Sequence, residues 1–205
     1  MLKIVSGGQT GADRAALDWA IDNELELGGW CPADRLAEDG PILARYQLTE
    51  LAGAGYRQRT RRNVDDSDAT LVVNSGELDG GTRQTVQFAE RAQKPLLVLG
   101  LDTLSLPVAA AMLNDWLAIH RPDVLNVAGP RESKRPGIGQ STYKLLAAAL
   151  ELRQLKGSQT KRPPPTGRPS PKLEQMLAGL TPEQVEQAIA TTARLLAIKA
   201  RKKRP

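Results

Sequence analysis

The sequence has one cysteine, Cys31, and one histidine, His120, in 205 residues. A single cysteine excludes an internal disulfide and fits a reducing compartment. Because zinc sites are built from several cysteine and histidine ligands, these two residues also argue against a zinc site, and we assign no metal ligand. Aromatic residues make up only 3 % of the chain, which disfavours a platform on which nucleic-acid bases stack.

Long apolar runs are also missing. No segment approaches the roughly 20 consecutive apolar residues that are needed to span a bilayer. The chain opens directly on a strand pattern and shows no signal peptide. We therefore expect a cytoplasmic protein with no membrane partner.

Positive charge is scarce in the first three quarters of the chain, although the net charge is +5. Residues 1–155 contain 17 Lys and Arg against 20 Asp and Glu, whereas residues 156–205 contain 11 against 3. The basic character therefore belongs to the C-terminal end of the sequence. It gives no support to an anion site elsewhere in the chain.

Strand and helix patterns alternate along residues 1–155. Short apolar runs typical of buried parallel strands are Leu2–Val5, Ala69–Asn74, Pro95–Gly100 and Val124–Val127, with Leu27–Trp30 as a shorter candidate. Helical patterns cover Ala12–Asn23, Gly55–Val64, Thr82–Gln93, Pro107–His120 and Gly139–Lys156. This order predicts an α/β fold, namely a Rossmann-like three-layer domain with a mostly parallel sheet. The long irregular segment Ala33–Leu51 is of a kind that is often functional.

A change of composition marks a basic helical C-terminal extension. Residues 156–171 are expected to form a Pro-rich basic linker, and residues 172–205 are expected to form a basic helical tail. Such a tail can contact nucleic acid or another anionic surface. The alternatives are a solubilising extension and a helical pair that packs on a neighbouring subunit through Val185, Ile189 and Leu196.

The glycine-rich loop Ser6–Asp13, which reads SGGQTGAD, lies between the first strand and the first helix. Glycines allow backbone N–H groups to approach an anion, and a helix N-terminus adds donors and a positive dipole end. The loop matches neither the Walker A motif nor the GxGxxG fingerprint, so the alternative is an ordinary strand-to-helix turn. Thr10 is expected to cap the helix, with Asp13 in a capping-box position.

Polar loops follow two further strands. In a parallel sheet, ligands bind outside the carboxyl ends of the strands, so these loops are expected to share one site with the glycine-rich loop. The residues expected to line this site for an anionic small molecule are Gly7, Gly8, Gln9, Thr10, Gly11, Asp13, Arg14, Asn74, Ser75, Gly80, Gly81, Thr82, Thr85, Gly129, Pro130, Arg131, Glu132 and Ser133. Candidate acids and bases are Asp13, Asp39, Glu77 and Glu132, but no arrangement of residues indicates catalysis, and we assign no catalytic residue.

Residues 1–150 resemble the putative molybdenum carrier family, a branch of the SLOG superfamily of Rossmann-like proteins. The segments that carry the resemblance are Lys3–Arg14, Gly28–Pro32, Leu36–Ile42, Arg59–Leu71, Gly76–Thr82 and Leu125–Ile138. The resemblance implies binding of molybdenum cofactor (molybdopterin) or of a nucleotide, and similar proteins are often homo-oligomers. It also implies that Arg59 and Asn63 face the pocket, whereas the charge pattern alone is typical of a solvated helix face.

A second branch of the superfamily consists of phosphoribohydrolases, which cleave nucleoside monophosphates. Their motif GGxGTxxE is matched here by Gly80 and Gly81, but Arg83, Gln84 and Gln87 replace the glycine, the threonine and the glutamate. Because a glutamine cannot serve as a general base, the sequence favours a carrier over an N-glycosidic hydrolase. A nucleotide-sensing module with a nucleic-acid-binding tail is the other alternative.

Overall fold

The computed structural model describes residues 2–53 and 55–159, with side chains through Leu150. Residues 160–205, with most of the expected linker and the whole tail, lie outside the described residues. The last helix, α5 (Ile138–Gln159), continues beyond Lys156. The domain boundary expected after residue 155 therefore falls inside α5, and the division into linker and tail beyond it stays a prediction.

One parallel sheet forms the middle layer of the described chain. Its strands are β1 (Lys3–Val5), β2 (Glu26–Gly28), β7 (Ala69–Asn74), β8 (Leu96–Gly100) and β9 (Val124–Ala128), in the order β2-β1-β9-β7-β8. All four neighbouring pairs are parallel. Every residue of β7 is buried, as expected for a strand covered on both faces.

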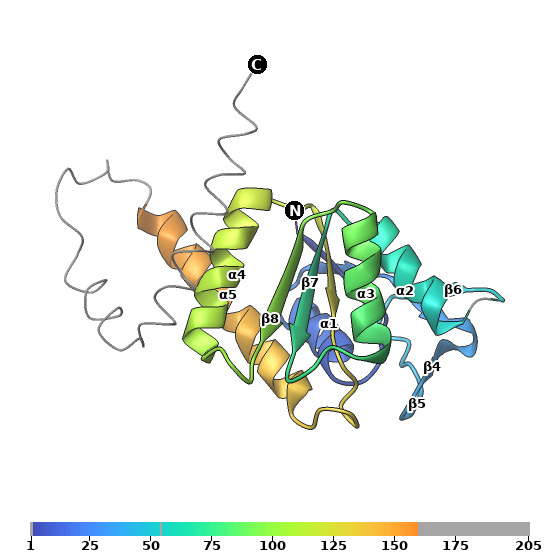
Figure 1. Ribbon diagram of the computed structural model, residues 1–205. Helices are drawn as coiled ribbons and strands as arrows, with labels where there is room; N and C mark the ends of the chain where they lie inside the picture. The colour runs from blue at the N-terminus through green and yellow to red at the C-terminus, as the bar shows by residue number, and fades with distance from the viewer. Residues whose placement is uncertain (1, 54, 160–205) are drawn as a thin grey trace, which may run out of the picture. The chain divides into compact units, whose positions relative to one another are not determined.

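Helices cover both faces of this sheet (Figure 1). The helices α4 (Leu106–His120) and α5 lie on one face, and α1 (Ala12–Asp22) packs against α5. The other face carries α2 (Tyr56–Asp65) and α3 (Gly80–Arg91), which pack against each other. The predicted Rossmann-like three-layer α/β fold is confirmed. Within the described residues, no helix has the length and apolarity needed to cross a membrane.

The main core lies between the sheet and the helices α1, α4 and α5. Trp19 and Trp116 pack there against apolar side chains of the central strands, including Leu71 and Leu125. Burial of apolar side chains on both faces of the sheet is the main stabilising contribution to such a fold. The carboxyl ends of the strands therefore form a firmly held edge on which the loops are built.

The predicted strand Leu27–Trp30 is wrong as a single element. Strand β2 ends at Gly28, and the chain turns at Gly29, whose φ is +123°. A Cβ at Gly29 would lie 2.2 Å from the Ser6 carbonyl oxygen, so only glycine allows this close approach. The chain then forms β3 (Trp30–Pro32), which pairs with β6 (Thr49–Leu51) away from the main sheet.

The segment between β3 and β6 is folded around a small core of its own. A short 3₁₀ turn (Ala33–Arg35) leads into an antiparallel hairpin of β4 (Leu36–Ala37) and β5 (Gly40–Pro41). Beneath it, Cys31 is fully buried in a cluster with Leu17, Ile42, Tyr46 and Leu48. Burial raises the pKa of the Cys31 thiol, which is consistent with a structural role.

Candidate functional site

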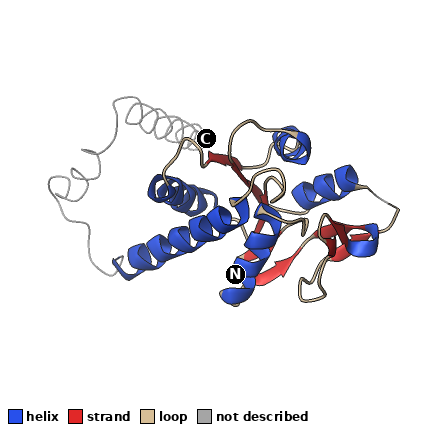
Figure 2. Ribbon diagram, turned by 90° about the horizontal axis from the view of Figure 1, so that it is seen from below, coloured by secondary structure: helices blue, strands red, loops and turns tan. Residues whose placement is uncertain are grey.

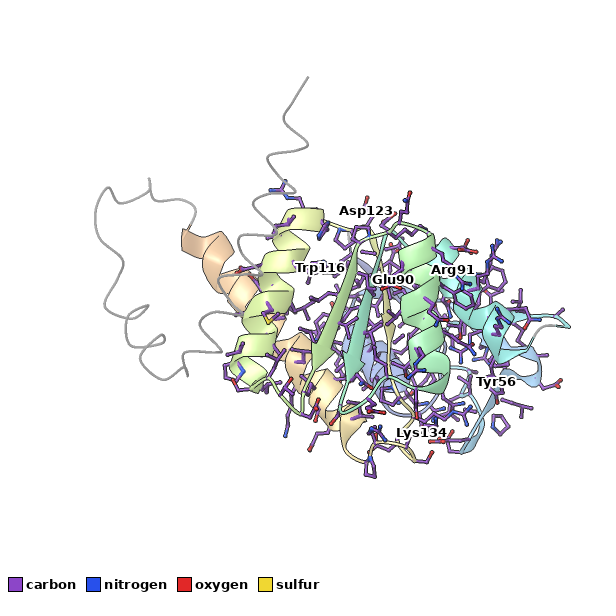
Figure 3. All side chains as sticks on the ribbon, in the orientation of Figure 1. Tyr56, Glu90, Arg91, Trp116, Asp123 and Lys134 are labelled. Atoms are coloured by element: carbon purple, nitrogen blue, oxygen red, sulfur yellow. The ribbon has the colours of Figure 1, made fainter. Side chains whose placement is uncertain are left out.

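The carboxyl ends of the strands lie at the lower edge of the molecule in Figure 3. That view places Asp123, which precedes β9, at the upper edge and Lys134, which follows β9, at the lower edge. Figure 2 views the molecule from this lower edge. We call this edge the rim. It carries the loops that follow β1 (residues 6–11), β7 (residues 75–79) and β9 (residues 129–137).

The rim loops after β1 and β9 are in direct contact. The backbone N–H of Ala12 donates to the Pro130 carbonyl at 3.3 Å, and that of Glu132 donates to the Thr10 hydroxyl at 3.3 Å. A Cβ at Gly11 would lie 2.5 Å from the Pro130 carbonyl oxygen. The glycine at position 11 is therefore needed so that the two loops can touch.

The loop after β7 joins the same edge through basic side chains. Arg135 donates from Nε to the Ser75 carbonyl at 2.6 Å, and Lys134 forms an ion pair with Asp79 at 3.0 Å. The structure thus brings together the three loops that the sequence placed on one edge. The convergence follows from the parallel sheet, because every strand delivers its following loop to the same side.

Arg59 and Asp13 meet at the centre of the rim. Arg59, from α2, donates from Nη1 to Oδ2 of Asp13, from α1, at 3.3 Å, and both side chains are buried. Burial raises the pKa of Asp13, while Arg59 and backbone N–H donors from Gln9 and Gly129 act in the opposite direction. The Asp13 carboxyl therefore ties the loops after β1 and β9 to a cation from the opposite face of the sheet.

Gly7 provides the space that this arginine occupies. A Cβ built at Gly7 would lie 1.5 Å from Nη1 of Arg59 and 2.9 Å from Oδ2 of Asp13. The guanidinium is therefore packed directly against the backbone of the glycine-rich loop. This contact gives a physical reason for glycine at position 7 that does not depend on a ligand.

Three buried donors at the rim have no hydrogen-bond partner in the described residues: Nε of Arg59, Nε2 of Gln9, and Nε of Arg14, whose Nη2 donates to the Gly8 carbonyl. Arg59 and Gln9 retain only 9 % and 5 % of their exposure. Because an unsatisfied buried donor costs about 1–3 kcal/mol, such groups call for an explanation. A hydrogen-bond acceptor brought by a ligand would satisfy them.

A half-exposed tyrosine connects α2 to the loop after β9. The guanidinium carbons of Arg59 and Arg131 lie 5.9 and 5.4 Å from the centre of the Tyr56 ring. Figure 3 shows Tyr56 near the lower edge of α2. Contacts of this kind hold Arg131 toward Arg59, so two positive groups are held close to the glycine-rich loop.

The β4–β5 hairpin is held onto the glycine-rich loop by two carboxylates that follow one another in the chain. Glu38 accepts hydrogen bonds from the Thr10 hydroxyl and from the hydroxyl and backbone N–H of Ser133. Asp39 forms an ion pair with Arg14. Burial alone would raise the pKa of Glu38, but the hydrogen bonds from Ser133 and Thr10 outweigh burial and lower it.

Glu38 was not among the residues expected from the sequence. The neighbouring Asp39 was named as a candidate acid, yet nothing local predicted that Glu38 would contact Thr10 and Ser133. The sequence signal for Glu38 was a pair of adjacent carboxylates, Glu38 and Asp39, in a long irregular segment. The rim loops carry basic and hydroxyl groups, with which such carboxylates can bond.

Several expected site residues have their polar groups engaged within the protein. Asn63 accepts from the Trp30 N–H at 2.7 Å and donates to the Trp30 carbonyl at 3.0 Å, so its amide holds β3. Glu132 accepts from the backbone N–H groups of Gly137 and Gly139 near the start of α5. The contact of Asn63 with a ligand stays a prediction, for which its amide has no group left that is not bonded to Trp30 in one of these two ways.

The capping prediction for α1 is also wrong. The N-cap position is taken by Gly11, with φ +77°, and no side chain caps the helix. The Thr10 hydroxyl instead donates to Glu38 and accepts from the backbone N–H of Glu132. Asp13 consequently lies one residue closer to the helix start than a capping box requires.

Gly80 and Gly81, which were expected to contribute to the anion site, lie at the start of α3. The helix starts at Gly80, after Asp79 in extended conformation, and a Cβ at Gly81 would meet nothing within 4 Å. Thr82 and Thr85 are buried, and the Thr85 hydroxyl donates to the Gly81 carbonyl at 3.0 Å. The Asn74 amide donates to the Gly76 carbonyl at 2.6 Å and shapes the preceding turn.

Two open grooves border this region, and of its three buried donors without partners only Arg14 Nε belongs to a residue that lines one of them, the larger. The larger, of about 620 Å³, lies between α1 and α5 and reaches the rim at Thr10, Gly11 and Glu132. The smaller, of about 440 Å³, lies between α2 and α3 and is lined by Arg57, Arg61 and Arg91, among others. Neither is lined by Arg59 or Gln9, so we place the candidate site at the rim and not in the larger groove. Among the described residues, no group of three Cys, His, Asp or Glu side chains is arranged to hold a metal ion.

Comparison with known proteins gave two matches. Residues 4–150 match the model of the circularly permutated YpsA SLOG family. A crystal structure of the "putative molybdenum carrier protein" from Syntrophus aciditrophicus SB is similar to this chain at 49% sequence identity, with a TM-score of 0.72. That match covers 73% of this chain and 95% of the other. Curated proteins gave no match.

Proposed function

This chain belongs to the circularly permutated YpsA SLOG family, and from that premise we propose that its rim binds an anionic, phosphate-bearing small molecule. The cargo that we favour is molybdenum cofactor, which the protein would carry without transforming it. The similar crystal structure from Syntrophus aciditrophicus SB is named a putative molybdenum carrier protein. It matches 73% of this chain at 49% sequence identity.

The observation that carries the proposal is the pair of buried, unsatisfied donors, Arg59 Nε and Gln9 Nε2. They lie at the residues that the parallel sheet brings to its carboxyl edge. A phosphate has several acceptor oxygens, and arginine binds phosphate through planar, charge-assisted hydrogen bonds. An anion at this position would satisfy donors that the protein itself leaves without partners.

The donor set at the rim also fits a cofactor that brings its own metal ligands. Molybdenum cofactor is a pterin with a phosphate and a dithiolene that binds the metal. Arg59, Arg131 and the backbone amides of the glycine-rich loop would hold its anionic parts. No thiolate or imidazole is required from the protein, which agrees with the scarcity of cysteine and histidine in the sequence.

Extraction of the ligand tests the proposal. The full chain is purified under native conditions from cells that make molybdenum cofactor, and the extract is analysed by mass spectrometry and by metal analysis. A pterin and molybdenum are expected from the wild type and should be much reduced in the Arg59→Ala variant. Recovery of a nucleotide in place of the pterin would support the anion site but contradict molybdenum cofactor as the ligand.

The same preparation also tests whether the protein is a nucleotide hydrolase. Release of free base from added nucleoside monophosphates would contradict a carrier and favour hydrolysis. Gln87 at the position of the hydrolase glutamate argues for no release. The expectations of a homo-oligomer and of nucleic-acid contact through residues 172–205 stay predictions.

A further inference from the structure

Glu38 occupies donors that the sequence analysis assigned to a ligand. Its carboxylate accepts from the Thr10 hydroxyl, the Ser133 hydroxyl and the Ser133 backbone N–H. These three donors come from two different rim loops and converge on one carboxylate. A carboxylate and a phosphate present similar oxygen acceptors, so Glu38 stands where an oxyanion of a ligand would be bound.

The environment of the carboxylate is suited to negative charge. Arg131 lies close enough to Glu38 for an attractive electrostatic interaction, and the N-terminus of α1 begins two residues after Thr10. The Gln9 amide lies at the same junction, where its Oε1 accepts from the backbone N–H of Glu38 at 2.9 Å. Its Nε2, buried and without a partner, is a second and independent sign that an acceptor belongs here.

The element that carries Glu38 is small enough to move. Strands β4 and β5 have two residues each, and they pair only with each other. The tip of this hairpin is held to the glycine-rich loop mainly by Glu38 and by the Asp39–Arg14 ion pair. Exposed polar contacts of this kind contribute little stability each, so opening of the hairpin tip costs little beyond the contact of Ala37 with the small core.

We propose that Glu38 is an internal competitor of the ligand, and that the hairpin Leu36–Pro41 opens when a phosphate group takes over the Thr10 and Ser133 donors. The inference rests on the proposed function, because it concerns access to the same rim. It assigns to Glu38 a role in setting affinity. The ligand that displaces it must bring an oxyanion, since only a charged acceptor can replace a carboxylate on these donors.

Titration calorimetry with inorganic pyrophosphate tests the proposal on the full-length protein. Glu38→Gln removes the competing charge but keeps the shape of the side chain, and should bind pyrophosphate at least about tenfold more tightly than the wild type, equivalent to about 1.4 kcal/mol. Asp34→Asn is the matched control. It removes one negative charge from the turn before the hairpin, at φ +58°, a conformation that asparagine also adopts, and it leaves the contacts of Glu38 and Asp39 in place, so the affinity should change by less than about threefold.

The results separate this inference from the proposed function. Binding by the wild type without tightening in Glu38→Gln, or equal tightening in Asp34→Asn, would overturn the inference alone. Absence of binding in all three proteins would contradict both. If Glu38→Gln does not fold, hydrogen exchange on the wild type decides. The Glu38 amide should exchange faster at saturating pyrophosphate, and slower or unchanged exchange would overturn the displacement.

Discussion

Arg59 and Asp13 lie 46 residues apart, on helices from opposite faces of the sheet, and their side chains meet at 3.3 Å beside Gly7. The contact closes the carboxyl edge of the sheet around the glycine-rich loop. It leaves Nε of Arg59 buried without a partner. One carboxylate therefore positions the arginine, and the arginine keeps a donor for the ligand.

Removal of Arg59 should affect both stability and binding. Arg59→Met leaves the Asp13 carboxyl buried without its cation, and the free energy of unfolding should fall by about 3 kcal/mol in a urea titration. The double variant Arg59→Met with Asp13→Asn removes both charges, and should recover most of that loss. Ligand binding should stay absent in the double variant. Recovery of binding together with stability would show that Arg59 is only structural.

Substitution of Gly7 should affect both folding and binding. In Gly7→Ala, the new Cβ displaces the end of the Arg59 side chain from Asp13, so the free energy of unfolding should fall by up to about 3 kcal/mol, as in Arg59→Met. Ligand binding should also be lost, because the guanidinium leaves its position. Binding is measured by ligand recovered on native purification, and stability by urea titration.

Two other glycines provide the controls for Gly7→Ala. Gly81→Ala meets open space and should change neither property by much. Gly11→Ala meets the backbone of Pro130 at 2.5 Å with φ +77°, so it should destabilise the protein by about 2 kcal/mol or more. Normal ligand content in Gly7→Ala would contradict the placement of the ligand beside Arg59.

Asn63 should prove structural. Asn63→Ala leaves the N–H and the carbonyl of Trp30 without their partner, and should lower the free energy of unfolding by about 2 kcal/mol. The affinity of the folded protein for its ligand should stay within about threefold of the wild type. A large loss of affinity at unchanged stability would support the expectation that this amide contacts the ligand.

The stability that Glu38 contributes through its bonds with Thr10 and Ser133 should depend on pH in the acid range. Hydrogen bonds lower the pKa of Glu38 below its ordinary 4.5. The stability that Glu38 contributes is therefore fully present above pH 4.5 and is lost as the pH falls through its lower pKa in the folded protein. The difference in unfolding free energy between wild type and Glu38→Gln should shrink over that range. A carboxyl pKa at or above 4.5 for Glu38, measured by NMR titration, would contradict this.

The sequence was most informative where the signal is local. The apolar runs at Ala69–Asn74 and Val124–Val127 predicted strands of the parallel sheet, because burial on both faces requires continuous apolar residues. The parallel order then placed the loops on one edge. The glycine-rich loop could thus be assigned to the rim before any contact was known, whereas Arg59 was assigned to the pocket only through the family resemblance.

Long-range pairings were beyond the reach of the sequence. Thr10 looked like a helix cap, but its hydroxyl contacts a carboxylate 28 residues away. Asn63 looked like a ligand contact, but its amide holds a strand 33 residues away. Each of these polar groups can form a hydrogen bond with a local or with a distant partner. The packing of the irregular segment between β3 and β6 determines which partner is bound.

The central claim is that the ligand binds at the rim beside Arg59 and not in the larger groove between α1 and α5. Amide chemical shifts of ¹⁵N-labelled protein, followed during titration with inorganic pyrophosphate, test it most directly. The account predicts the largest changes at Gly7–Gly11 and Gly129–Ser133, and their loss in Arg59→Met with Asp13→Asn. Changes centred on Ala15, Tyr143 and Lys144, which line the groove, would contradict it.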